Sequence, residues 1–215
     1  MLQIESFLGG YDDNFTYLIW CRDTRSAALV DAATPVRPIR QIIEEKNLNL
    51  AHILLTHTHG DHLTYLMEWL QRYPRLQVLG HQRPESSHLP SYRGLADGTS
   101  FSLGCCGLEV IETPGHYPDC VCWYERQSGS LFTGDTVFVG RTGRTLSPGS
   151  SLRQLYHSVY ERILTLPTDT VVYPGHDYGS TPTISLGELR KSSDFFHCGN
   201  EAEFMQVMAR FERNR

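Results

Sequence analysis

The feature that most constrains this chain is the stretch Thr56-His57-Thr58-His59-Gly60-Asp61-His62. It follows the apolar run 52–55, which is typical of a buried strand, and precedes apolar residues at helical spacing over 63–70. Three imidazoles and a carboxylate therefore lie on one strand-to-helix loop, where Gly60 permits a tight backbone path. Neutral imidazole and carboxylate are the usual protein ligands of Zn, Fe and Mn, so the stretch predicts a metal site.

The alternative is a polar surface loop that happens to be rich in histidine. Histidine is uncommon, and several potential ligands within 57–62 directly after a buried strand are not what we expect of solvent-exposed side chains without a function. One loop cannot fill a coordination sphere, so a metal site requires further donors elsewhere in the chain.

Length and composition limit the class of protein. The 215 residues can bury one substantial core, and we expect a single domain over 1–215 with a terminal helix at about 200–213 packed on it. The net charge of -5, without a basic stripe, gives no case for a nucleic-acid partner. No apolar run is long enough to span a bilayer and the start of the chain lacks a signal-peptide pattern, so we expect a cytoplasmic protein without a membrane partner.

The six cysteines do not form a recognisable metal or redox motif. Cys120-Val121-Cys122 is too closely spaced for a redox pair or a zinc knuckle. We expect the cysteines to be small buried hydrophobes in a reducing compartment.

Apolar patterns elsewhere predict both strands and helices. Strands are expected at 15–20, 27–30, 52–55, 77–79, 100–103, 108–112, 121–125, 131–133 and 170–173. The first two are expected to form a hairpin at the start of the chain. Helices are expected from Pro35 to near Asn47 and at 63–73, 152–164 and 201–212. Residues 81–99 have no clear period, so they are expected to be an irregular surface segment whose His81 and His88 are not ligands.

Several predicted strands end directly in a short loop that carries a further donor. His116, Asp135 and His176 each follow such a strand and come directly after a glycine. Ligand sites in mixed α/β folds gather where strand ends meet loops. Each of these turns alone could be ordinary, but together with 57–62 they supply five histidines and two aspartates, enough for one or two metals. A metal-stabilised binding module would need only four ligands, so the donor count favours an enzyme.

In order and spacing, these motifs resemble the metallo-β-lactamase superfamily over nearly the whole chain. The resemblance implies an α/β (α+β) fold, a four-layer αββα sandwich of two similar halves. The implied ligands of a first metal are His57, His59, His116 and Asp135. A second metal would be held by Asp61, His62 and His176, with Asp135 bridging. Asp61 also suits proton handling, and the implied catalytic residues are Asp61, His57, His116 and Asp135.

Within the superfamily, the sequence resembles two branches that act on glutathione derivatives. Persulfide dioxygenases oxidise glutathione persulfide to sulfite with one Fe(II), and the residues that match its ligands here are His57, His116 and Asp135. Glyoxalase II enzymes hydrolyse S-acylglutathione thioesters at a dinuclear site. The motifs that favour the first branch are HxPxC at 116–120, GRT at 143–145, HDY at 176–178 and the short segment after them. The segment 137–140 is similar to glyoxalase II and keeps the second branch open.

Arg144 and Tyr178 are the expected ligands of glutathione carboxylates, because they offer a planar fork and a hydroxyl on a rigid ring. The pairs 141–142 and 146–147 depart from the pattern of the dioxygenases, which puts glutathione as the thiol carrier in doubt. Asp177 is expected to order its loop or bond a ligand histidine.

We therefore expect a metalloenzyme that acts on a small-molecule glutathione derivative. Its cofactor is expected to be Fe(II), or one or two Zn(II) in the hydrolase alternative. The sequence is compatible with a homodimer.

Overall fold

The computed structural model describes residues 1–213 and divides most strands between two six-stranded sheets. The strands of the first sheet are β1 (Leu2–Gly9), β2 (Asn14–Cys21), β3 (Ser26–Val30), β4 (Asn49–Leu54), β5 (Gln77–His81) and β6 (Tyr92–Leu95), in that spatial order. Those of the second are β7 (Ser100–Leu103), β8 (Cys106–Glu112), β9 (Val121–Glu125), β10 (Ser130–Gly134), β13 (Val171–Pro174) and β14 (Ile184–Ser185), in the order β14-β13-β10-β9-β8-β7. A separate ribbon joins β11 (Val137–Phe138) to β12 (Arg141–Thr142).

Both sheets mix antiparallel and parallel pairing. In the first, β1, β2 and β3 are antiparallel neighbours, whereas β3 to β6 run parallel. In the second, β10 and β13 form the parallel pair. The parallel strands β4, β10 and β13 supply the loops that carry predicted donors.

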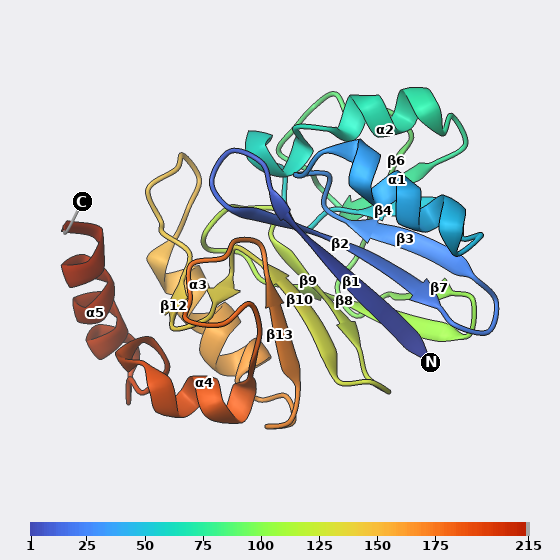
Figure 1. Ribbon diagram of the computed structural model, residues 1–215. Helices are drawn as coiled ribbons and strands as arrows, with labels where there is room; N and C mark the ends of the chain where they lie inside the picture. The colour runs from blue at the N-terminus through green and yellow to red at the C-terminus, as the bar shows by residue number, and fades with distance from the viewer. Residues whose placement is uncertain (214–215) are drawn as a thin grey trace.

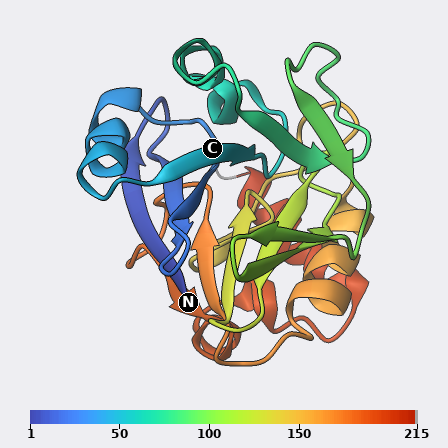
Figure 2. The ribbon, with the colours of Figure 1, turned by 90° about the vertical axis from the view of Figure 1, so that its right-hand side faces the viewer.

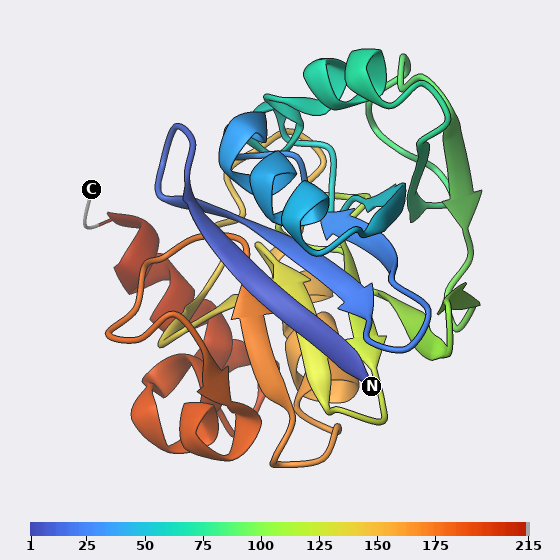
Figure 3. The ribbon, with the colours of Figure 1, turned by 45° about the vertical axis from the view of Figure 1, so that its right-hand side comes forward.

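Helices cover the outer face of each sheet. They are α1 (Val36–Glu45), α2 (Leu66–Arg72), α3 (Leu152–His157), α4 (Leu186–Ser192) and α5 (Glu201–Arg213). Ile39 of α1 and Trp69 of α2 are buried against the first sheet, and Leu189 of α4 and Phe204 of α5 belong to the cluster on the second. Figure 1 and Figure 3 show α1 and α2 on one side of the strands and α4 and α5 on the other. Figure 2 gives the same arrangement from the side.

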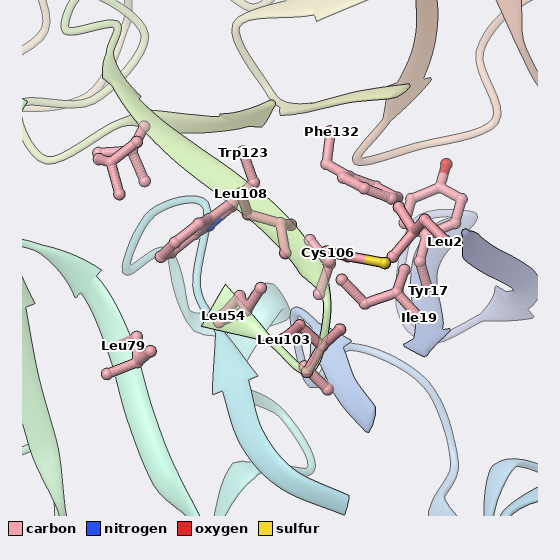
Figure 4. Close-up of a cluster of buried hydrophobic side chains, with 14 of the residues drawn as sticks. Leu2, Tyr17, Ile19, Leu54, Leu79, Leu103, Cys106, Leu108, Trp123 and Phe132 are labelled. Atoms are coloured by element: carbon pink, nitrogen blue, oxygen red, sulfur yellow. The ribbon is translucent and has the colours of Figure 1, made fainter. Parts of the chain in front are cut away.

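A third apolar cluster fills the space between the sheets. Tyr17 and Leu54 of the first sheet and Trp123 and Phe132 of the second point into this interior (Figure 4). Each fully buried side chain of this size contributes about 1.5–3 kcal/mol relative to an exposed one. The three clusters separate four layers, and the αββα sandwich implied by the resemblance is confirmed.

Direct hydrogen bonds join the two sheets at one end. The Tyr17 hydroxyl donates to the Pro174 carbonyl at 2.7 Å, and the Trp123 indole donates to the Leu55 carbonyl at 3.0 Å. The backbone N–H of Phe15 donates to the carbonyl of Gly175 at 2.8 Å. Because these bonds lie just beyond the ends of β4 and β13, they bring the donor loops of both sheets together.

Most predicted elements lie close to their observed positions, with differences at edges. The hairpin of 15–20 and 27–30 is β2 and β3, but its place at the start was wrong because β1 precedes it. The segment 81–99 was expected to be irregular, yet it contains β6, where exposed Arg93 and Gly94 hide the strand pattern.

Three helical segments also differ from the prediction. The helix expected at 63–73 is a 3₁₀ turn at Gly60–Leu63 followed by α2. The helix expected at 152–164 begins as α3 and continues as a π-helix at Ser158–Ile163. Helix α4 was not predicted.

The cysteines are free thiols. Cys21, Cys106, Cys120 and Cys122 are buried as expected, whereas Cys105 is exposed and Cys198 is half-buried. Within residues 1–213, no helix combines the length and the apolar character needed to cross a membrane.

Candidate metal centre

Seven side chains from four loops converge where the two sheets meet. We call this set the donor cluster, and its members are His57, His59, Asp61, His62, His116, Asp135 and His176. The loop after β4 and the 3₁₀ turn supply the first four, and the loops after β8, β10 and β13 supply one each. All seven are the donors that the sequence predicted.

One side of the donor cluster consists of nitrogen atoms alone. His57 Nε2 and His116 Nε2 each lie 3.0 Å from His59 Nδ1. Donor atoms of these three residues all lie within 4.8 Å of one another, which is the spacing of ligands around one ion.

The other side combines imidazole with carboxylate. His176 Nε2 lies 3.4 Å from Asp61 Oδ2 and 3.4 Å from Asp135 Oδ2. His62 Nε2 lies 3.2 Å from Asp135 Oδ1 and 3.5 Å from Asp61 Oδ2. Asp135 also lies 3.4 Å from His116 Nε2, so this carboxylate sits between the two sides.

Two buried atoms of the donor cluster fit a bound cation. His62 Nε2 and Asp135 Oδ1 are buried and have no hydrogen-bond partner, although they face each other. Orphaned buried polar atoms are rare because they cost free energy. A side chain at Gly175 would collide with Asp135 Oδ1 and approach His62 Cε1, so the glycine keeps this space clear. A divalent transition metal would satisfy both atoms.

Four histidines are oriented by a second hydrogen bond from Nδ1. His62 Nδ1–H donates to Asp31 at 2.8 Å, and His57 Nδ1 lies 3.2 Å from the Thr56 hydroxyl oxygen. His116 and His176 donate in the same way to the carbonyls of Arg144, at 2.7 Å, and Asp12, at 2.6 Å. Each bond leaves Nε2 directed at the centre, the arrangement found in metal-binding histidines.

Asp31 is a positioning residue that sequence reasoning missed. Its buried carboxylate accepts hydrogen bonds from the Thr56 backbone N–H, the Thr56 hydroxyl and His62, each at 2.8 Å. The signal was available, because Asp31 directly follows β3 just as Asp135 follows β10.

Two further buried polar residues hold the same loop. Asn14 donates to Asp61 Oδ2 at 2.8 Å and lies 3.4 Å from His176 Nε2. Asp119 accepts from the Thr58 hydroxyl at 2.5 Å and from the Thr58 backbone N–H at 3.2 Å. Neither stood out in the sequence, since each is a single polar residue in an ordinary turn.

The electrostatics of the donor cluster favour neutral ligands on its nitrogen side. Burial lowers the pKa of His57 well below its ordinary value, and burial next to His116 lowers the pKa of His59 to about 4. Burial also disfavours charge on His176, but hydrogen bonds to Asp135 and Asp61 raise its pKa to about 10. Neutral imidazole is the form that binds metal.

A pocket of about 850 Å³ opens over the carboxylate side of the donor cluster, within the usual size of small-molecule sites. Arg144 and Tyr178, the predicted substrate residues, both line it. The Tyr178 hydroxyl donates to Asp12, and its ring stacks on His176 with centroids 4.8 Å apart. Arg141, noted in the sequence as a departure, also lines the pocket.

Other residues singled out in the sequence lie outside the donor cluster. His81 pairs with Glu112 at 3.2 Å, and His88 is exposed. Cys120 is buried away from the pocket lining. The backbone N–H of Asp177 donates to the Asp13 carbonyl at 2.9 Å, and the role expected of its side chain stays a prediction.

Known proteins are similar to this chain in fold and in sequence. The chain is 34% identical over 196 residues to a mitochondrial persulfide dioxygenase of Homo sapiens, ETHE1, covering 90% of this chain and 75% of that protein. It is 31% identical over 221 residues to a probable hydroxyacylglutathione hydrolase of Schizosaccharomyces pombe, covering 93% and 84%. The solved structure of ETHE1 from Myxococcus xanthus matches with a TM-score of 0.87 and 28% identity, covering 97% of this chain and 91% of that one. Residues 9–176 match the family description of the metallo-beta-lactamase superfamily, and this chain belongs to that superfamily.

Proposed function

We propose that this protein is a persulfide dioxygenase that uses O₂ and water to convert a glutathione-type persulfide into sulfite and the thiol. The observation that carries the proposal is the similarity along most of the chain to a persulfide dioxygenase, in sequence and in structure. The sequence motifs at 116–120, 143–145 and 176–178 support the same branch.

On this proposal, His57, His116 and Asp135 would hold Fe(II), which when bound supplies O₂ activation and a position for a sulfur anion. The Arg144 carbonyl and the Thr56 hydroxyl fix the two imidazoles in the ligating tautomer. Asn14 engages Asp61 Oδ2, one of the oxygens that a second ion would need.

The pocket then orients the persulfide and limits the water around it. Phe138 and the stacked pair of His176 and Tyr178 form its apolar side. Asp61 is 27% exposed in its side chain, lies at the pocket surface and has a pKa held below its ordinary value by hydrogen bonds to His176 and Asn14 that outweigh burial. It is therefore an ionised carboxylate at the pocket surface, and its lowered pKa makes it a weak base.

A specific observation supports thioester hydrolysis as the second candidate. Donor atoms of Asp61, His62 and His176 lie within 4.8 Å of one another, so a second ion has a complete ligand triad. Two Zn(II) ions lower the pKa of a bound water and supply hydroxide near neutral pH. The similarity to a probable hydroxyacylglutathione hydrolase supports this candidate.

One paired assay separates the two candidates. Glutathione persulfide is supplied to iron-loaded protein at an oxygen electrode, and S-lactoylglutathione hydrolysis is measured on the same sample. The dioxygenase proposal predicts oxygen uptake with sulfite release and negligible hydrolysis. Rapid thioester cleavage without oxygen uptake would overturn it.

Metal content gives an independent readout. On the dioxygenase proposal, anaerobically purified protein holds about one iron per chain, and His62→Ala and His176→Ala retain it. Loss of half the metal in either variant supports the dinuclear hydrolase. His88→Ala, at an exposed histidine outside the donor cluster, is the matched control.

The cytoplasmic location expected from the sequence stays a prediction, since the human relative is named as mitochondrial. The homodimer also stays a prediction.

A further inference from the structure

The ribbon of β11 and β12 places two arginines at the pocket directly beside the donor cluster. Arg141 lies in β12 and Arg144 two residues after it, and both line the pocket. Gly143 between them packs on the donors, because a side chain there would collide with the Asp135 carbonyl and lie 2.9 Å from His116 Nδ1. The arginines are therefore held in fixed register with the proposed metal ligands.

Aromatic rings support both guanidinium groups. Arg141 Cζ lies 4.0 Å from the ring centroid of Tyr178, 5.2 Å from that of Phe211 and 5.7 Å from that of Phe138. Arg144 Cζ lies 4.9 Å from the same Phe211 ring. We call Arg141, Arg144 and Phe211 the arginine wall. Stacking on several rings restricts the guanidinium and leaves its N–H groups free for a ligand.

Neither arginine has an anionic partner within residues 1–213. Their Nε atoms are buried without a hydrogen bond, and neither side chain forms an ion pair with a described carboxylate. The nearby carboxylates are engaged, since Asp12 accepts from Tyr178 and Glu212 accepts from Thr145. Five arginines outside the pocket are paired with carboxylates, among them Arg126 with Glu109, Arg153 with Glu201 and Arg162 with Asp97.

The two positive charges also act on each other. Burial lowers the pKa of Arg141 and the charge of Arg144 adds to that effect, whereas Tyr178, Asp12 and Asp135 oppose it. Two partly desolvated guanidinium groups of this kind are stabilised by an anion that bridges them, and the bidentate fork of arginine matches carboxylate and phosphate oxygens.

We propose that the arginine wall is an anion clamp in which Arg141 is a specificity-determining residue, selecting thiol derivatives that carry a carboxylate or phosphate group remote from the sulfur. The sulfur end of such a molecule would face His116 and Asp135, which line the same pocket. The role of Tyr178 changes accordingly: its hydroxyl is bonded to Asp12 and its ring carries Arg141, so it is a support for the clamp and not a carboxylate ligand. This inference rests on the proposed action on a thiol derivative.

Two kinds of thiol carry the required charge. Glutathione has a carboxylate at each end of its backbone, and 4′-phosphopantetheine has a phosphate monoester at the end away from its thiol. N-acetylcysteamine has a similar thiol end without the anion. Binding of all three to the zinc-loaded full chain, measured by titration calorimetry, tests the clamp without turnover, because zinc does not react with O₂.

We expect at least one anionic thiol to bind more tightly than N-acetylcysteamine. Arg141→Gln should weaken that binding roughly 10- to 100-fold and leave N-acetylcysteamine within about twofold, since hydrogen bonds to charged groups are the strong ones. Arg141→Lys keeps the charge without the fork and should fall between the two. The identity of the affected thiol distinguishes carboxylate from phosphate as the natural end-group.

Arg126→Gln is the matched control, because Arg126 also stacks on a tyrosine, with its Cζ 5.5 Å from the Tyr124 centroid, but pairs with Glu109 outside the pocket. Equal binding of charged and uncharged thiols by wild type, or equal loss for all three in Arg141→Gln, would overturn the clamp. The oxygen-electrode and hydrolysis assays are separate readouts. Tighter binding of anionic thiols without oxygen uptake or hydrolysis would overturn the proposed function alone. Either reaction without a difference in binding between charged and uncharged thiols would overturn the clamp alone.

Discussion

The donor cluster and the arginine wall face the same pocket but are held by different means. The donor cluster sits at the ends of strands in both sheets, and His57, His62 and His176 are almost fully buried. The arginine wall comes from β12, from the loop after it and from α5, and its side chains are only half-buried. One region is fixed by hydrogen bonds and the other by ring contacts.

This difference suits the donor cluster to metal binding and the arginine wall to substrate selection. Hydrogen bonds from three histidines to Asp31 and to two carbonyls hold the imidazoles in place, as metal binding requires. Substitution of the stacked arginines should disturb the structure less, since no buried hydrogen-bond network depends on their side chains. We infer that the donor cluster determines the class of reaction and the arginine wall determines which thiol derivative enters.

Removal of a central ligand should have the largest effect. Asp135→Ala takes away the carboxylate between the two sides of the donor cluster, so the protein should lose its metal and roughly 1,000-fold or more of its activity. Elemental analysis and the paired assay measure both losses. Full metal content in this variant would contradict the proposed ligand set, and His88→Ala should match wild type.

Disturbing the support of the donor cluster should cost less. Asp31→Asn keeps the shape of the side chain but weakens the hold on His62 and Thr56, so metal affinity should fall roughly 10- to 100-fold. Competition with a chelator measures the change. An unchanged affinity would show that Asp31 serves folding alone. Asp23→Asn, at an exposed carboxylate near the start of the chain, controls for loss of charge.

Changes in the arginine wall should leave the metal in place. Phe211→Ala removes the ring that contacts Arg141 and Arg144, and we expect a roughly 3- to 10-fold rise in KM for an anionic substrate with metal content unchanged. Helix α5 remains anchored by Phe204 and Met208. Leu146→Ala, at an exposed residue in the loop that carries Arg144 but outside the pocket lining, should leave both KM and metal content unchanged. Loss of metal in Phe211→Ala would contradict the claim that the arginine wall affects substrate binding without affecting the metal.

The sequence predicted the donor cluster well because its signal is local. A histidine-rich loop after an apolar strand, and single donors after glycine, are patterns within a few residues, and the resemblance they carry implied the αββα sandwich. Strand β1 was missed because it lies at a sheet edge and Leu2 is its only buried residue. Strand β6 and helix α4 were missed because each carries too short an apolar pattern to stand out.

What the sequence determined by itself was therefore which side chains can act as donors, and that they follow strands. Only the tertiary structure decided which groups hold them, because the bonds join residues far apart in the chain: Asp31 with His62, Asn14 with Asp61, and Asp12 with His176. The same holds for Arg141, which was only a departure from a family pattern in the sequence. Its proposed role appears once α5 brings Phe211 against it, since a half-buried guanidinium with an unpartnered Nε is stabilised by an anion from outside.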